Sequence, residues 1–168
     1  MMSLDFNPDE ILEMAQQVER NGFHFYQQAA KGVKNPGSAQ LLLKLAAMEE
    51  GHERIFARMR AELTEAEKKK KIFDPEDQTT SYLRAWADAH VFDVRADPAE
   101  KLTGKEKVED ILQMAIGLEK DSIVFYLGMK EMVPERLGRG KIDGIIKEEM
   151  RHVNDLSREF ETLRHQPL

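Results

Sequence analysis

The stretches Glu49-Glu50-Gly51-His52 and Glu149-Met150-Arg151-His152 are the clearest sign that the chain repeats itself. Glu149 follows Glu49 by 100 residues, and the two stretches share only their first and last residue. The same offset relates Ile11-Leu12 to Ile111-Leu112, Glu19 to Glu119, and Phe25-Tyr26 to Phe125-Tyr126. A fixed offset over so many positions indicates two copies of one structural unit.

The first copy is predicted to form a hairpin of two helices. Asn7-Pro8-Asp9-Glu10 is a helix start signal, with Asn as N-cap, Pro at the first helical position and Glu three residues after the cap. This helix should run to about Lys31. The turn Lys34-Asn35-Pro36-Gly37 then precedes a second helix, capped by Ser38 and reaching about Lys70.

The second copy is predicted to form an equivalent hairpin. Thr103-Gly104-Lys105-Glu106 resembles a capping box that starts the third helix, which should run to about Met132. The fourth helix should begin between residues 135 and 141 and end near Arg164.

The connection between the hairpins, about residues 64–103, is too long for the short loops of an up-down-up-down bundle. It suits a crossover along the bundle, which gives the second and third helices the same direction. Residues 82–87 read as a short helix within it, and Lys68 to Lys71 as a solvated helix end. The predicted fold is all-α: a single domain, residues 1–168, with a four-helix bundle of two repeated hairpins (about 8–70 and 104–164).

Composition excludes several classes of protein. The 31 acidic and 25 basic side chains give a net charge of −6, which argues against a broad basic surface for nucleic acid. The chain has no cysteine, so disulfides, thiolate zinc sites and iron–sulfur clusters are excluded. Without an apolar run of roughly 18 residues or a basic leader, we expect a cytoplasmic protein with no membrane partner.

The predicted buried face of each helix is apolar except at its middle, where every helix carries a glutamate and two carry a histidine as well. These residues are Glu19, Glu49, His52, Glu119, Glu149 and His152. Four buried ionised carboxylates repel one another, and each costs several kcal/mol without compensation. Two divalent metal ions would balance four glutamates and two neutral imidazoles. A Glu and a His three residues apart can reach one ion, and the other two glutamates can bridge or cap the pair.

This pattern resembles the ferritin-like superfamily and, within it, the rubrerythrin-type proteins. The resemblance implies that these six residues bind two iron ions, with manganese as the other candidate. It also implies an oxidoreductase, a non-haem di-iron peroxidase or oxidase, that reduces hydrogen peroxide or dioxygen in oxidative-stress defence. Two departures weaken the likeness: Ser122 stands where rubrerythrins usually have a further glutamate, and the cysteine-containing rubredoxin domain is missing. Electrons would therefore come from a separate protein such as a rubredoxin.

Three other functions remain open: a ferroxidase or iron-handling protein, a di-iron oxygenase of the hydroxylase type, and a metal-free helical interaction module. Tyr26 and Tyr126 lie two turns beyond Glu19 and Glu119. They are either core aromatics, or they donate a hydrogen bond to a ligand carboxylate or pass an electron to an oxidised metal pair. One of four neighbouring acidic residues could orient a ligand imidazole: Glu50, Glu53, Glu148 or Asp155. We also expect a homodimer, in which the long crossover would allow hairpins to exchange.

Overall fold

The computed structural model of the protein describes residues 7–70, 78, 81 and 97–165. Four long helices make up most of it. They are α1 (Pro8–Gly32), α2 (Pro36–Ala61), α5 (Val108–Met129) and α6 (Arg139–Arg164). The short elements are α3 (Glu65–Lys68) and the 3₁₀ turns η1 (Pro98–Lys101), η2 (Lys130–Met132) and η3 (Glu135–Leu137). The described residues contain no strand. The predicted all-α four-helix bundle is confirmed.

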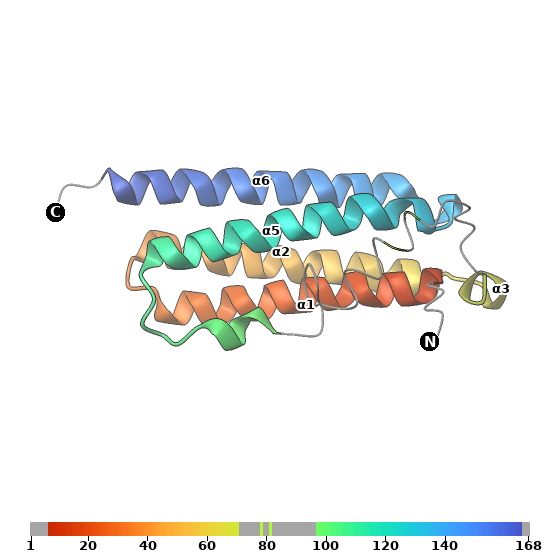
Figure 1. Ribbon diagram of the computed structural model, residues 1–168, viewed down its shortest axis with the longest axis horizontal. Helices are drawn as coiled ribbons and strands as arrows, with labels where there is room; N and C mark the ends of the chain where they lie inside the picture. The colour runs from red at the N-terminus through yellow and green to blue at the C-terminus, as the bar shows by residue number, and fades with distance from the viewer. Residues whose placement is uncertain (1–6, 71–77, 79–80, 82–96, 166–168) are drawn as a thin grey trace.

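The helices are arranged as two antiparallel pairs, α1 with α2 and α5 with α6 (Figure 1). The helices α2 and α5 run in the same direction, as a long crossover requires. At one end of the bundle lies α3, and η1 packs against α1 towards the other end. The helix predicted at residues 82–87 and Lys71 lie outside the described residues. Lys69 and Lys70 are exposed at the end of α3.

The start of α1 follows the sequence prediction, whereas the start of α2 does not. At α1, the Asn7 side chain accepts a hydrogen bond from the Glu10 backbone N–H, and Glu10 accepts one from that of Asn7. At α2, Asn35 is the N-cap and accepts from the Ser38 backbone N–H, so Ser38 is not the cap. The reason is Pro36, whose fixed φ fits the first helical position and moves the cap to the residue before it.

Two other helix boundaries also differ from the prediction. The helix α2 ends at Ala61 rather than near Lys70, because Thr64 forms a new capping box with Glu67 and starts α3. At the predicted box, the Thr103 backbone N–H and hydroxyl both donate to Glu106 Oε1, and the hydroxyl accepts from the Lys105 backbone N–H instead of completing the box. These residues lie in a loop, and α5 begins only at Val108. Gly104, with φ +79°, holds that loop in the left-handed conformation, which a helix cannot contain.

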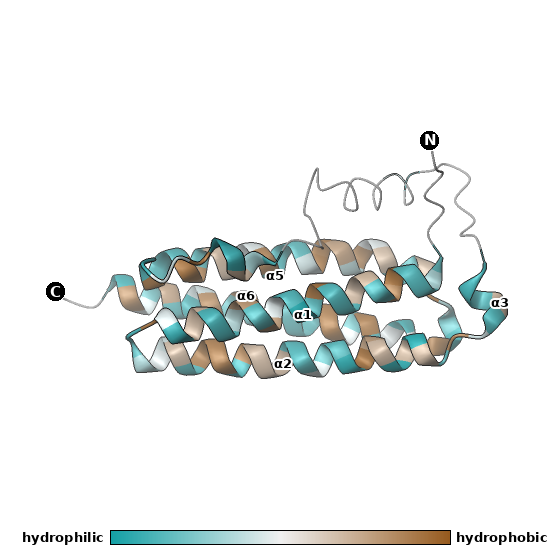
Figure 2. Ribbon diagram, turned by 90° about the horizontal axis from the view of Figure 1, so that it is seen from below, coloured by the Kyte–Doolittle hydropathy of each residue, from teal (hydrophilic) through white to brown (hydrophobic). Residues whose placement is uncertain are grey.

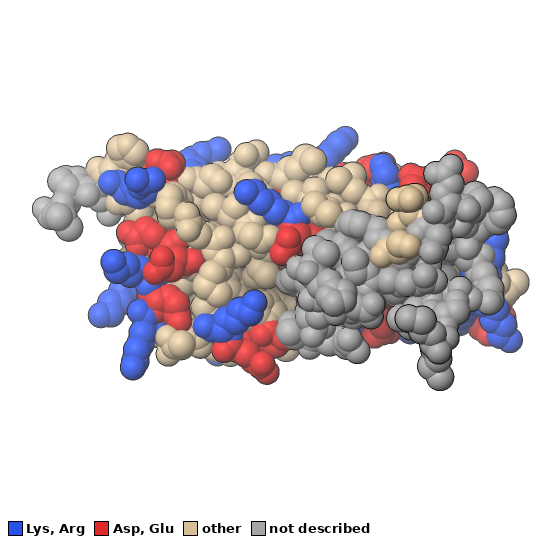
Figure 3. All heavy atoms as spheres, viewed as in Figure 1, with Lys and Arg blue, Asp and Glu red and all other residues tan. Residues whose placement is uncertain are grey.

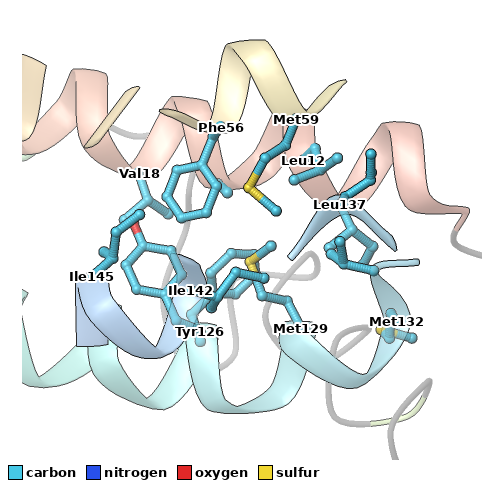
Figure 4. Close-up of a cluster of buried hydrophobic side chains, with 14 of the residues drawn as sticks. Leu12, Val18, Phe56, Met59, Tyr126, Met129, Met132, Leu137, Ile142 and Ile145 are labelled. Carbon is cyan, nitrogen blue, oxygen red and sulfur yellow. The ribbon is translucent and has the colours of Figure 1, made fainter. Parts of the chain in front are cut away.

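The interior consists of two apolar clusters separated by a polar layer. One cluster includes Leu12, Phe56, Met59, Met129 and Ile142, which point toward one another in Figure 4. The other includes Phe25, Leu42, Leu45, Leu112 and Leu156. Along each of the four helices, the mid-helix glutamate separates the residues of one cluster from those of the other. The two clusters therefore fix the helices on both sides of the polar layer.

The surface agrees with a bundle of amphipathic helices. Hydrophilic and hydrophobic residues alternate along α1 and α2 (Figure 2). On the face shown in Figure 3, the described acidic and basic side chains are interspersed rather than gathered by sign. Within the described part of the chain, no helix has both the length and the apolar character needed to cross a membrane.

Candidate metal centre

Six side chains converge at the middle of the bundle and form two overlapping groups of potential metal ligands. The His52 group consists of Glu19, Glu49, His52 and Glu149, and the His152 group of Glu49, Glu119, Glu149 and His152. Within each group, one ligand atom per residue lies within 4.8 Å of all the others. All six residues are at most 3% exposed. Glu49 and Glu149 belong to both groups, whereas the end glutamates, Glu19 and Glu119, belong to one group each.

The helices deliver these residues as the repeat predicts. A single glutamate comes from α1 and another from α5, whereas α2 and α6 each supply a glutamate and a histidine one turn later. The His52 and His152 rings are stacked, with centroids 5.8 Å apart and planes 18° apart. The two histidines therefore face the same layer from opposite helices.

The inward-facing nitrogen and oxygen atoms of these side chains lie close together, but most of them make no hydrogen bond to one another. His52 Nδ1 lies 2.8 Å from a Glu149 oxygen, and His152 Nδ1 lies 3.3 Å from oxygens of Glu119 and Glu149. Nevertheless, both Nδ1 atoms, both Glu149 oxygens and one oxygen each of Glu19 and Glu49 make no hydrogen bond of good geometry within the described structure. Buried polar atoms are almost always paired. Nitrogen and oxygen atoms that converge in this way fit a divalent cation better than one another.

Burial and close contact shift the pKa values of the six central side chains. Burial raises the pKa of Glu19, Glu49 and Glu119, and the neighbouring carboxylates raise that of Glu49 further. Burial acts to lower the pKa of His52, but the close carboxylates of Glu149 and Glu19 outweigh it and raise that pKa to about 11. Without a cation, the layer therefore retains protons that two divalent ions would displace.

Two tyrosines connect the hairpins by hydrogen bonds to the end glutamates. The Tyr26 hydroxyl donates to Glu119 Oε1, and the Tyr126 hydroxyl donates to Glu19 Oε1. Each tyrosine thus contacts the glutamate of the other copy. Burial and the adjacent carboxylate raise both tyrosine pKa values well above 10, so the phenols keep the protons they donate. The structure thus favours the hydrogen-bonding interpretation over a purely apolar packing role.

One of the four acidic residues considered as an imidazole partner occupies that place. Glu148 Oε2 lies 2.7 Å from His52 Nε2, on the outer side of the ring. The other three pair with basic side chains: Glu50 with Arg54, Glu53 with Arg20, and Asp155 with Lys44 and Arg158. Sequence alone could not choose among them, because the choice depends on the rotation of α6 against α2.

Gly22 is a functional position that the sequence analysis missed. A Cβ atom at Gly22 would lie 2.7 Å from Glu49 Oε2, so the absent side chain makes room for that carboxylate. The signal was available, since Gly22 follows Glu19 by three residues on the same helix face and the repeat places another small residue, Ser122, at the equivalent position. The Ser122 hydroxyl donates to the Leu118 carbonyl at 3.1 Å.

A small cavity adjoins the two groups on the side of α1 and α5. It is lined by Glu49, Glu119, Tyr26, Gly22, Ser122 and, from η1, Pro98, among others. Its volume is about 10 Å³, which is near the minimum that holds one water molecule. Small residues at the equivalent positions 22 and 122 leave this space beside two of the carboxylates.

The bundle and its buried set of carboxylates and imidazoles define a ferritin-like protein with a candidate di-metal centre. The family model for rubrerythrin matches residues 10–160, and the chain belongs to the rubrerythrin family. Among solved structures, it resembles a protein from Thermotoga maritima described as a ferritin-like diiron-carboxylate protein. That similarity has a TM-score of 0.70 and 21% sequence identity, and covers 95% of this chain and 98% of the other. A comparison with curated proteins finds no match.

Proposed function

We propose that this protein binds two iron ions at the central layer and uses them to reduce hydrogen peroxide, or dioxygen, in oxidative-stress defence. The observation that carries the proposal is the pair of buried four-residue groups sharing Glu49 and Glu149. Membership of the rubrerythrin family and the description of the similar Thermotoga maritima protein support iron. Carboxylate and imidazole donors also suit manganese, which is the other candidate.

The six residues have distinct roles in this proposal. Glu49 and Glu149, which belong to both groups, would contribute to holding both ions; Glu19 and His52 would help to hold one, and Glu119 and His152 the other. The Tyr26 and Tyr126 hydroxyls hold the end glutamates in place. When bound, two ferrous ions supply the two electrons that break an O–O bond.

The cavity beside Glu49 and Glu119 favours a small oxidant over an organic substrate. Its volume of about 10 Å³ is near the minimum for one water molecule, whereas pockets for organic ligands are roughly 300–1,000 Å³, so it is far too small for an organic substrate. A larger groove of about 660 Å³ touches His52 and Glu148, on the outer side of that imidazole. The small volume of the cavity beside Glu49 and Glu119 weighs against the hydroxylase alternative.

We propose that a separate protein donates the electrons. Reduction of one hydrogen peroxide to two waters consumes two electrons and two protons, and this chain has no cysteine with which to hold a rubredoxin-type iron. A separate donor such as a rubredoxin is therefore part of the proposal.

Anaerobic loading with ferrous iron tests the proposed function. We expect about two irons per chain, and near-ultraviolet absorption that rises much faster after hydrogen peroxide is added than after air. The matched control is Glu50→Gln, which changes an exposed carboxylate beside Glu49 and should alter neither result. Failure to bind metal after reconstitution would overturn the proposal and favour the helical interaction module.

A ferroxidase is a second candidate, which Ser122 favours. Its hydroxyl bonds to the Leu118 carbonyl and adds no carboxylate to the six, so this chain lacks the extra glutamate usual in rubrerythrins. Oxidation that is as fast in air as in peroxide, together with a large hollow assembly in solution, would support iron storage. The expected homodimer, with or without exchanged hairpins, is tested by the same measurement of molar mass.

A further inference from the structure

The two histidines of the centre have different partners on their outer sides. His52 Nε2 lies 2.7 Å from Glu148 Oε2, a contact between α2 and α6. The His152 Nε2 atom is buried and has no hydrogen-bond partner among the residues that the structure describes. The two halves of the centre therefore have equivalent inward-facing ligand atoms, but they differ in the hydrogen-bond partner of the outer histidine nitrogen.

The repeat explains the difference at the level of sequence. The position equivalent to Glu148 in the first copy is Met48. A thioether sulfur is only a weak hydrogen-bond acceptor, so methionine cannot replace the carboxylate in this role. A single difference between the copies thus removes the partner from one histidine.

A carboxylate behind a metal-binding imidazole changes how that imidazole binds. Donation from Nε2–H to Glu148 leaves the lone pair on Nδ1, the atom that faces the other site residues. It also fixes the ring orientation and makes Nδ1 a stronger ligand. His152 lacks these effects, and its ring must select its tautomer and orientation when a metal ion binds.

We infer that the two metal positions are unequal, and that Glu148 is the positioning residue that makes the His52 position fill first and hold its ion more tightly. The ion at the His152 position is the exchangeable one. Loss of such a partner typically weakens metal binding by about 10-fold to 100-fold, which sets the expected difference between the positions. The inference rests on the proposal that the centre holds two metal ions.

The surroundings allow this assignment to be tested by exchanging residues. Met48 and Glu148 line the same surface groove, together with Gly51 and Ile55, and the Glu148 side chain is 38% exposed. A carboxylate at position 48 would therefore remain near solvent rather than become a buried unpaired charge.

The experiment is an anaerobic titration of the metal-free full chain with Co²⁺, followed by calorimetry. A parallel titration followed by visible absorption reports the ligand environment of the bound Co²⁺. For the unmodified protein we expect two binding steps whose affinities differ by roughly 10-fold to 100-fold. Glu148→Met should weaken the tighter step by a similar factor and make the steps nearly equal. Met48→Glu should instead strengthen the weaker step, and Glu50→Gln should change neither.

Two equal steps in the unmodified protein would overturn the inference, as would equal weakening of both steps by Glu148→Met. Should Glu148→Met fail to fold, as circular dichroism would show, Met48→Glu still decides the question: an unchanged weaker step contradicts the inference. Failure of the proposed function looks different. Two equal bound ions that peroxide oxidises rapidly in the iron-loaded protein would leave that function standing, whereas absence of binding would overturn it.

Discussion

The His52 half and the His152 half of the centre are built from equivalent positions of one repeat, yet they differ immediately outside the converging atoms. Glu148 contacts the outer nitrogen of His52, whereas the equivalent position near the other half is Met48. Gly22 leaves room for Glu49, whereas its equivalent, Ser122, bonds to its own helix. The comparison shows that the two copies share the six inward residues while their supporting neighbours have diverged.

The largest expected effect separates the shared glutamates from the end glutamates. Glu149→Gln removes a carboxylate common to both groups, so we expect it to abolish binding of both ions. Glu119→Gln alters only the His152 group and should leave about one ion per chain. Elemental analysis after reconstitution measures both variants. Equal metal content in the two would break the distinction between shared and end residues.

A second, smaller effect concerns the space beside Glu49. Gly22→Ala places a Cβ atom 2.7 Å from Glu49 Oε2, so the carboxylate must move and metal affinity should fall about 10-fold or more. The matched control is Gly117→Ala, since a Cβ there has no neighbour within 4 Å. The control should raise helix stability by about 0.5–1 kcal/mol and leave metal binding unchanged. Unchanged affinity in Gly22→Ala would show that Glu49 tolerates displacement.

The bundle and the six central residues could be predicted from sequence because the repeat marks the same positions twice. A glutamate in the middle of each apolar helix face identifies the polar layer without knowledge of how the helices pack. The start of α2 was predicted wrongly although the sequence contains the signal: Asn35 and Ser38 are both good caps, and Pro36 decides between them. The contact of Glu148 with His52 depends on the rotation of α6 against α2, which the pattern within a single helix does not contain.

The tyrosine hydroxyls should have a moderate and symmetrical effect. Tyr26→Phe removes the donor to Glu119, and Tyr126→Phe removes the donor to Glu19. Each leaves a buried carboxylate oxygen without that partner, which typically costs about 1–3 kcal/mol. Urea unfolding of the metal-loaded protein measures the loss. If one variant lost much unfolding free energy and the other lost none, the two halves of the centre would also differ at their end glutamates, contrary to the expected symmetry.

The smallest expected effect on stability comes from an ion pair outside the centre, which is present in the first hairpin and has no equivalent in the second. Asp9 accepts two hydrogen bonds from Arg60 across α1 and α2, whereas the equivalent of Arg60 in the second copy is Phe160. Both side chains are about one-third exposed, so solvent screens the pair and Asp9→Asn should cost about 1 kcal/mol or less.

The pH dependence of this ion pair has a definite sign. The hydrogen bond from Arg60 lowers the pKa of Asp9 below its ordinary value of 3.8. The stabilisation is therefore present above pH 3.8 and is lost as the pH falls through the lowered value. Chemical unfolding between pH 2 and pH 6, with Asp9→Asn as the reference, measures it. A difference between the two proteins that is unchanged across this range would contradict the assignment.

A crystal structure of the anaerobically iron-loaded protein, with anomalous diffraction at the iron edge, would show whether the polar layer holds two iron ions. We expect two peaks between Glu49 and Glu149, one beside Glu19 and His52 and the other beside Glu119 and His152. At limiting iron, the peak beside His52 should be the stronger. Absence of iron from this layer, or a single ion that does not contact both Glu49 and Glu149, would contradict the account.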